Sequence, residues 1–512
     1  MFGPKLTFFH VSANGASAVT EHRTSASFSP SGSSPSSPVV DSSSVADQLS
    51  DVSTKDQPRR ELGLFDSICI IVGIIIGAGI YETTPKIAGC LPNTEWLLGV
   101  WMIGGLLSFL GALCYAELAT AFPHSGGDYV FLTRAYGRHL GFLFAWCELW
   151  IVRPGSIGMM AFVFARYARE IVPLNVANSP QLSMLVYALG AIAVLTLVNI
   201  LGVRQGNWTQ NFLTTLKILS LILIFVVGMF LLSPAGEKPI DPTPNQTATF
   251  NLYLAMILVL FTYGGWNEMA YVAAEVKNPT RNILRALVLG TVSVTAIYVL
   301  VTVAFVRGLS FTGVQQSNVV ASDLLRLAFG NWGGKMIAVI ICISTLGVIN
   351  GQIFTGARVY YAMGRDHRVF GLLGNWDPQR STPIWSLVVQ GVITIGLVAG
   401  FGWYQDGFNN LLNFTTPIFW TFFFLVGLSL FVLRAREPEV PRPYRVIFFP
   451  FLPIAFCCSC CFMIYASVTY AIRNQTYEAI WAIAFLVLGF LIALIVVRSP
   501  RAVSVPKVGA DK

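Results

Sequence analysis

Long apolar runs dominate the chain from Leu64 onward, and short polar segments separate them. A helix rises about 1.5 Å per residue, so about 20 apolar residues cross the hydrocarbon layer of a membrane, which is roughly 30 Å thick. Twelve runs meet this length, and they cover about 64–88, 96–122, 140–168, 183–203, 209–233, 250–275, 284–306, 336–362, 384–402, 408–433, 449–472 and 477–497. The pattern predicts an all-α integral membrane protein with twelve transmembrane helices.

The two ends of the chain have a different pattern. Residues 1–60 are rich in Ser and Pro and contain no long apolar run, so they bury too little surface to offset the entropy of ordering. They also lack the apolar core of a cleavable signal peptide. We therefore expect a disordered cytoplasmic tail at 1–60, a membrane domain at 61–498 and a short cytoplasmic tail at 499–512.

Composition and charge narrow the class of protein. The chain is 54% hydrophobic and 11% charged, whereas roughly a quarter of the residues of a soluble domain are charged. This difference excludes a soluble enzyme. The net charge is +8. Lys and Arg are about three times as frequent in one alternating set of loops as in the other, which predicts that both termini are cytoplasmic. Because the positive charge is spread over many loops, it forms no groove that could bind nucleic acid.

Side chains that could carry out catalysis or hold a metal are scarce within the apolar runs. All five His residues lie in tails or predicted loops, and no run contains a hydrolase pattern. The CCSCC segment at 457–461 has CxxC spacing, but Cys also packs well as a small apolar residue. We expect neither enzymatic activity, nor a metal site, nor a cofactor.

Glycines interrupt two of the apolar runs. The first run contains Gly73, Gly77 and Gly79, and the sixth contains Gly264 and Gly265. Gly73 and Gly77 also fit a GxxxG face for close helix packing. In lipid, however, an unwound segment is tolerated only where it faces protein or a hydrated cavity, so the recurrence of the interruption predicts a binding site between two broken helices.

The spacing of the two interrupted runs predicts an inverted repeat. The two interrupted runs are the first and the sixth, so corresponding positions are offset by five runs. Because five is odd, the second half would enter the membrane with the opposite orientation. We place repeat one at about 64–233, repeat two at about 250–433, and two further helices at 449–497. Free N–H groups at half-helix ends suit a carboxylate and free C=O groups suit an ammonium, so a zwitterion such as an amino acid fits this site.

Five stretches in order resemble the amino acid, polyamine and organocation transporter superfamily, and specifically its L-type amino acid transporter branch. They are IIVGIIIGAGI (70–80), ELWIVRPGS (148–156) with AFVFARY (161–167), FTYGGWN (261–267), EVKNP (275–279) and STLGVINGQIFTGARVYYAMGRD (344–366). The resemblance covers about 61–498. It implies a LeuT-type 5+5 inverted repeat with broken helices 1 and 6, working by alternating access.

The resemblance also implies a set of substrate-binding residues. The backbone of Gly77, Ala78 and Gly79 would bind the substrate carboxylate, and the carbonyls of Ile75 and Phe261 would bind its α-amino group. The Phe261 ring would act as a gate. Gly264 and Asn267 would border the side-chain pocket. Ala78 stands where the family commonly has Ser, so a hydroxyl that could assist carboxylate binding is absent.

Charged residues within the runs should have partners, because an isolated charge in the membrane is costly. By resemblance, Lys217 would stand in for a sodium ion between the first and eighth spans, and it could alternatively couple transport to protons. Glu148 and Arg153 match a structural ion pair of the family. Glu82 and Glu268 could attract a cationic side chain or simply face water.

The expected function is sodium-independent transport of amino acids, preferably neutral L-amino acids, by exchange across the plasma membrane. The alternatives are a proton-coupled symporter, a carrier of cationic amino acids or polyamines, and a transport-dead membrane sensor. Animal members pair through a Cys after the third span, but EIVPLNVANSPQL (170–182) contains none. No disulfide-linked heavy subunit is therefore expected, and the oligomeric state stays open.

Overall fold

The computed structural model describes residues 58–174, 179–234, 250–402, 407–473 and 478–497. These ranges belong to one compact unit, Ser53–Lys512. Within them the regular structure is helical, with two isolated β-bridges and no strand. The predicted tails lie outside the described residues, apart from 58–60, so their disorder stays a prediction.

Nine described helices are long and apolar enough to cross a membrane. They are Thr94–Ala121 (α4), Arg138–Ile171 (α6, η1 and α7), Pro180–Leu201 (α8), Val203–Leu231 (α9 and η2), Pro279–Leu309 (α11), Asn331–Asp366 (α14), Ile384–Gly402 (α15), Asn410–Arg436 within α16 (Gly407–Arg436) and Phe451–Thr469 within α17 (Phe451–Arg473). A tenth span forms if Leu64–Ile75 (α2) and Gly79–Gly89 (α3), bent by 46°, count as one. The all-helical membrane fold is confirmed.

The sixth and twelfth predicted spans are not among these full-length helices. One is split into Leu252–Thr262 (α10) and the 3-10 helix Trp266–Glu275 (η3), and the other is Glu478–Val496 (α18). α10 and η3 are each too short to cross alone, and the apolar part of α18, Ile480–Val496, is shorter than the helices counted as spans. The number twelve therefore stays a prediction, although every predicted run coincides with helical structure.

Local sequence signals explain where several helices begin. The side chain of Asn93 accepts a hydrogen bond from the Trp96 N–H at the start of α4, and Asn251 caps α10 in the same way. Ser179 caps α8, and Pro180 follows at the first helical position. Short polar side chains at these positions satisfy N–H groups that have no acceptor within the helix.

The segment between the second and third spans contains one short helix. The helix there is Asp128–Tyr136 (α5), and it ends at Gly137, whose φ of +100° favours glycine. Phe131, Leu132 and Ala135 are buried, and α5 packs against α6 (Arg138–Cys147) and α16. The helix is thus part of the protein core rather than a loosely attached surface element.

The two broken spans cross in opposite directions. α2 packs against η3, whereas α3 packs against α10, so the first half of each span meets the second half of the other. At one end the Leu62 N–H donates to the Glu275 carbonyl at 2.9 Å and the Lys277 N–H donates to the Leu62 carbonyl at 2.8 Å. This arrangement agrees with the opposite orientation that an inverted repeat requires.

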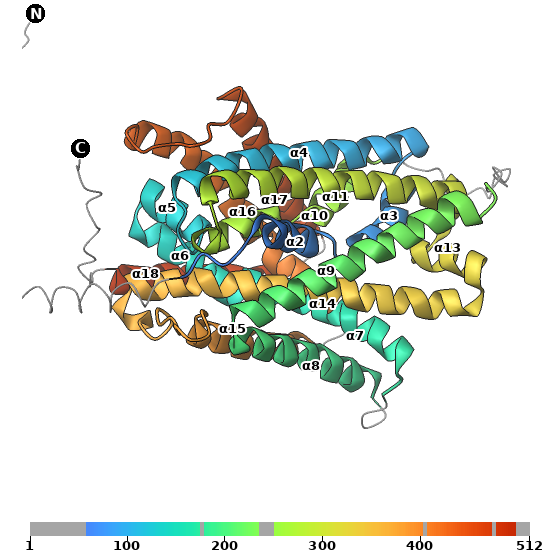
Figure 1. Cartoon of the computed structure of the whole chain (residues 1–512), viewed down its shortest axis with the longest axis horizontal. Helices are drawn as coiled ribbons and strands as arrows, with labels where there is room; N and C mark the ends of the chain where they lie inside the picture. The colour runs from blue at the N-terminus through green and yellow to red at the C-terminus, as the bar shows by residue number, and fades with distance from the viewer. Residues whose placement is uncertain (1–57, 175–178, 235–249, 403–406, 474–477, 498–512) are drawn as a thin grey trace, which may run out of the picture. The chain divides into compact units, whose positions relative to one another are not determined.

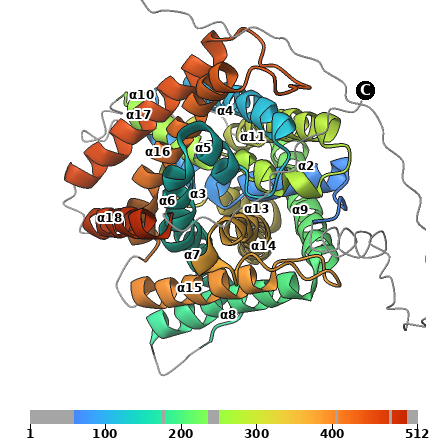
Figure 2. The ribbon, with the colours of Figure 1, turned by 90° about the vertical axis from the view of Figure 1, so that its left-hand side faces the viewer.

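Long helices surround this crossing. Figure 1 shows α4 and α11 running alongside each other on one side of α2 and α3, with α9 and α14 on the other side. In Figure 2, α8 and α15 lie together at one edge. The broken spans are therefore enclosed by intact helices, which protects their interrupted backbone from lipid.

A buried ion pair joins α14 to η3 near the crossing. Arg358 contacts both carboxylate oxygens of Glu275, with Nε–Oε1 at 2.7 Å and Nη2–Oε2 at 2.9 Å. Its remaining Nη1 donates to the Phe354 carbonyl at 2.6 Å. Both side chains are 1% exposed, so each charge depends on the other for compensation.

Replacing only Arg358 should be strongly destabilising. R358Q leaves the Glu275 carboxylate buried without its cation, and we expect the free energy of unfolding to fall by about 3–5 kcal/mol. Thermal unfolding of the detergent-solubilised chain measures this change. The double variant R358M/E275L removes both charges and should recover most of the loss; an R358Q protein as stable as the unmodified chain would contradict the prediction.

Candidate functional site

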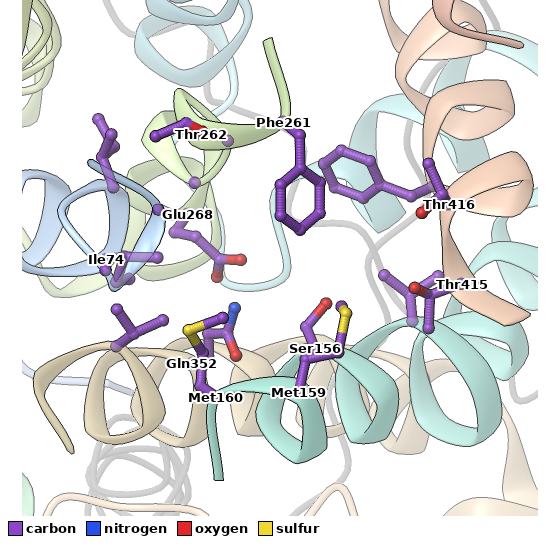
Figure 3. A pocket seen from close by; sticks show the side chains of 18 of the residues that line it. Ile74, Ser156, Met159, Met160, Phe261, Thr262, Glu268, Gln352, Thr415 and Thr416 are labelled. Carbon is purple, nitrogen blue, oxygen red and sulfur yellow. The ribbon is translucent and has the colours of Figure 1, made fainter. Parts of the chain in front are cut away.

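The breaks in the two discontinuous spans face a common cavity of about 130 Å³. A cavity of roughly 150 Å³ holds a molecule the size of benzene, so this space suits a small solute. The seven residues predicted to bind substrate all line it: Ile75, Gly77, Ala78, Gly79, Phe261, Gly264 and Asn267. In Figure 3 the Phe261 ring extends into the space, and Gln352, Met160 and Ser156 point into it from the opposite side.

The first break spans Ile76–Ala78, between α2 and α3. The Gly77 N–H turns back to the Ile75 carbonyl at 2.9 Å. Ala78 and Gly79 then begin α3, where first-turn N–H groups have no acceptor within the helix. The positive end of the α3 dipole therefore borders the cavity, as an anionic ligand group requires.

Side chains from neighbouring helices satisfy the carbonyl groups of this break. The Ser344 hydroxyl, on α14, lies 3.1 Å from the carbonyl oxygens of both Ile76 and Gly77. The Tyr298 hydroxyl, on α11, donates to the Ile75 carbonyl at 3.2 Å and lies 3.4 Å from the Thr262 carbonyl. One Tyr side chain thus joins the ends of both half-helices that approach the cavity.

The second break spans Tyr263–Gly265, between α10 and η3. Gly265 has a φ of +113°, and a Cβ atom there would lie 2.7 Å from Cγ2 of Ile74. The Phe261 carbonyl accepts hydrogen bonds from the Tyr263 and Gly264 N–H groups. The glycine therefore serves both the backbone conformation and the close approach of α2.

Acceptors for an ammonium group are distributed differently from the sequence-based expectation. The Ile75 carbonyl already accepts from Gly77 and Tyr298, which uses both lone pairs of its oxygen. By contrast, Oε1 of Gln352 and Oδ1 of Asn267 are buried and have no hydrogen-bond partner among the described residues. These two amide oxygens line the cavity, so they are acceptors that a ligand could use.

Lys217 lies behind the first break and does not line the cavity. Its Nζ donates to the Gly73 carbonyl at 2.6 Å, and a Cβ atom on Gly347 of α14 would lie 3.1 Å from it. The ammonium therefore sits between α2 and α14, the first and eighth predicted spans.

Glu148, Arg153 and Glu268 form a charged cluster in the cavity wall. Arg153 Nη2 lies 3.2 Å from Glu148 Oε2, and Nη1 donates to Glu268 Oε1 at 2.7 Å. Thr355 of α14 donates to the other Glu268 oxygen. Glu148 and Arg153, the predicted pair, are thus two members of a cluster of three, in which Glu268 makes the shorter contact to Arg153.

Glu82 has a different environment from Glu268. It is not among the residues that line the cavity, and it forms an ion pair with Arg166 and accepts a hydrogen bond from the Tyr167 hydroxyl. The Cys residues at 457–461 lie on α17, away from the cavity. Throughout the described ranges, no group of three or more His, Cys, Asp or Glu side chains could hold a metal ion.

Sequence reasoning missed the contribution of α14 to the site. Ser344, Val348, Gln352 and Thr355 follow one another at intervals of four, four and three residues, so they share one helix face. Ser344 contacts the first break, Val348 and Gln352 line the cavity, and Thr355 contacts Glu268. The signal was present as three polar residues, Ser344, Gln352 and Thr355, on one helix face within an apolar run.

Comparisons with known proteins agree on one family. The family model described as "Amino acid permease" matches residues 62–492. The human b(0,+)-type amino acid transporter 1 is 32% identical over 444 residues, covering 85% of this chain and 87% of that protein. The human large neutral amino acids transporter small subunit 2 is 30% identical, with 78% of this chain and 74% of that protein covered. The cystine/glutamate transporter of Pongo abelii is 29% identical, with 81% of each covered.

Substitution of Gly265 should damage the second break. G265A imposes a left-handed backbone conformation on a residue with a Cβ, which costs about 1–3 kcal/mol, and it places that Cβ against Ile74. G264A is the matched control, because its nearest neighbour would be the Phe261 carbonyl oxygen at 3.3 Å. We expect a lower thermal unfolding midpoint for G265A than for G264A. Equal midpoints would show that the break tolerates a side chain at Gly265.

Proposed function

We propose that this chain, which belongs to the amino acid permease family, carries neutral L-amino acids by sodium-independent exchange. The observation that carries the proposal is the pairing of helix-terminal N–H groups with free amide acceptors around one small cavity. Such a cavity suits a molecule with a carboxylate and an ammonium on adjacent atoms. Alternating access would then expose the cavity to each side of the membrane in turn.

The substrate carboxylate is proposed to bind at the start of α3. Ala78 and Gly79 supply N–H donors there, and the α3 dipole favours negative charge. The Gly77 N–H is already used by the Ile75 carbonyl. Because Ala78 replaces a Ser common in the family, backbone groups alone would bind the carboxylate.

The ammonium group is proposed to interact with the amide oxygens of Gln352 and Asn267, because the Phe261 carbonyl, like that of Ile75, already accepts two hydrogen bonds. Gln352 extends into the cavity opposite Phe261 (Figure 3). The oxygens of both amides lack another partner among the described residues. A charged donor satisfies a buried acceptor better than a neutral donor does.

A neutral substrate side chain is supported by the remaining cavity wall. Met159, Met160, Val348, Phe419 and Trp420 contribute apolar surface. Glu268 offers little to a cationic side chain, because Arg153 and Thr355 contact its two oxygens. Burial of an aliphatic or aromatic side chain in this region would contribute about 25 cal/mol per Å² of apolar surface.

Sodium independence is supported by the position of Lys217. Its ammonium contacts the Gly73 carbonyl between α2 and α14. A fixed ammonium there would stabilise the broken span in every state without a dissociable ion. We therefore propose a structural role for Lys217. Equal leucine uptake into preloaded and empty vesicles would instead make proton coupling the next hypothesis to test.

We further propose that the chain works in the plasma membrane with both ends in the cytoplasm and without a disulfide-linked heavy subunit. The distribution of Lys and Arg over alternate loops supports this orientation. The loop at 170–182 contains no Cys.

Exchange can be measured as labelled leucine uptake into proteoliposomes without sodium and at equal pH on both sides. We expect uptake into vesicles preloaded with unlabelled leucine and little uptake into empty ones. The reason is that an exchanger returns to the outward-facing state only with a substrate bound. Equal uptake into both would contradict obligate exchange. No uptake into either would contradict neutral amino acids as substrates.

A methyl group at the start of α3 should impair binding. The Cβ of G79A would lie 2.7 Å from Cγ2 of Thr262, which would displace the N–H groups proposed to bind the carboxylate. We expect leucine exchange to fall by about tenfold or more, because small misplacements of binding groups are costly.

G89A provides the control for this substitution within the same helix. Nothing lies within 4 Å of a Cβ atom at Gly89, so leucine exchange by G89A should match that of the unmodified chain. Comparable loss in both variants would indicate a general effect on α3. Normal exchange by G79A would contradict the proposed carboxylate site.

A further inference from the structure

Two carboxylates share one guanidinium in the cavity wall. Glu148, Arg153 and Glu268 have side chains that are 4%, 3% and 8% exposed, respectively. With all three groups ionised, this cluster carries one excess negative charge beside the substrate cavity. A charge buried at membrane depth requires compensation, either from a neighbouring cation or from a proton.

The neighbouring elements contribute no second cation to the cluster among the described residues. On α14, Arg358 is fully engaged with Glu275, and the Tyr360 hydroxyl donates to the Glu148 backbone carbonyl. On α9, Lys217 donates to the Gly73 carbonyl. The helices α15 and α16 present the uncharged side chains of Gln390 and Thr415 near Arg153 and the cavity.

The groups facing the cluster from η3 and α5 add no positive charge either. The Tyr271 ring centroid lies 5.4 Å from Cζ of Arg153, and the Tyr271 and Tyr115 hydroxyls donate to Oδ2 of Asp128. Burial raises the pKa of Asp128, which lies on α5 outside the spans, well above its ordinary range. Asp128 therefore holds a proton more tightly than an ordinary Asp, but it supplies no cation.

The contacts distinguish the two glutamates. Glu268 accepts a hydrogen bond on each oxygen, from Arg153 and from Thr355. Glu148 has the longer contact to Arg153, at 3.2 Å, and its Oε2 has no hydrogen bond among the described residues. Fewer donors stabilise the Glu148 carboxylate, so a proton gains more by binding to Glu148 than to Glu268.

Backbone geometry also marks Glu148. The residue begins the π-helical turn Glu148–Val152 (η1), which interrupts the span between α6 and α7 (Arg153–Ile171). Single π turns within α-helices occur frequently at functional sites. The turn sets Glu148 and Arg153 in the same wall of the cavity.

We propose that Glu148 is a proton-binding site, and that the carrier changes orientation fastest when this site is protonated. The proton removes the excess negative charge of the cluster before the cavity closes to one side of the membrane and opens to the other. This inference rests on the proposed transport function. In Figure 3 the neighbouring Glu268 carboxylate lies within the cavity, so the cluster is close to where a substrate would bind.

Leucine exchange at equal pH on both sides tests the proposal. Leucine stays zwitterionic across this range, so a change in rate reports on the protein. The unmodified full-length chain should exchange leucine about fivefold or more faster at about pH 5.5 than at about pH 7.5. In E148Q the rates at the two pH values should agree within about twofold, whatever their absolute size.

Two further Glu to Gln variants complete the comparison. E268Q leaves Arg153 with a single carboxylate, so its ratio of rates should also become flat. E82Q removes a carboxyl outside the cavity and should keep the ratio of the unmodified chain. A pH-independent unmodified chain, a pH-dependent E148Q or E268Q, or a flat E82Q would each overturn the proposal.

Infrared spectroscopy of the purified protein gives a readout that does not need transport. The carboxylic acid C=O band that appears between about pH 7.5 and about pH 5.5 should be absent in E148Q and present in E82Q. A band of full intensity in E148Q would overturn the assignment. Absence of preload-dependent leucine uptake at every pH would instead count against the proposed function, and the infrared result would still decide whether Glu148 binds a proton.

Discussion

A backbone N–H or C=O group without a partner costs several kcal/mol in the hydrocarbon of a membrane. The two interrupted spans expose such groups, and the surrounding structure satisfies them unequally. Ser344, Tyr298 and Lys217 supply donors to carbonyl oxygens of Ile75, Ile76, Gly77 and Gly73. The N–H groups at the start of α3 are left facing the cavity. Selective satisfaction of the carbonyls therefore leaves helix-terminal N–H groups beside the cavity, and the proposed carboxylate site depends on these donors.

The helical membrane fold and the position of the breaks follow from local features of the sequence. Apolar runs identify the helices, and the glycines at 73–79 and 264–265 mark where two of them unwind. Gly265 illustrates why, since its backbone conformation and the proximity of Ile74 both exclude a side chain. Such constraints act on the residue itself, so they leave a trace in a single sequence.

Tertiary contacts between polar residues were harder to anticipate. Lys217 evidently needed a partner, but that partner is a backbone carbonyl on another helix, and carbonyls look alike in every sequence. The pairing of Glu148 with Arg153 was visible from their proximity in the chain, whereas Glu268 joins them only through folding. Likewise, α5 showed aromatic residues in its sequence, but its burial depends on the helices that cover it.

The backbone hydrogen bonds between Leu62 and η3 have a mechanical consequence. They join the residue that precedes α2 to the residues that close η3, through Glu275 and Lys277. Two half-helices from opposite halves of the chain thus share one hinge. The two half-helices therefore either move together as one rigid body, or both hydrogen bonds must break before one moves alone. These hydrogen bonds therefore couple the two half-helices, and displacement of both together costs less free energy than displacement of either one alone.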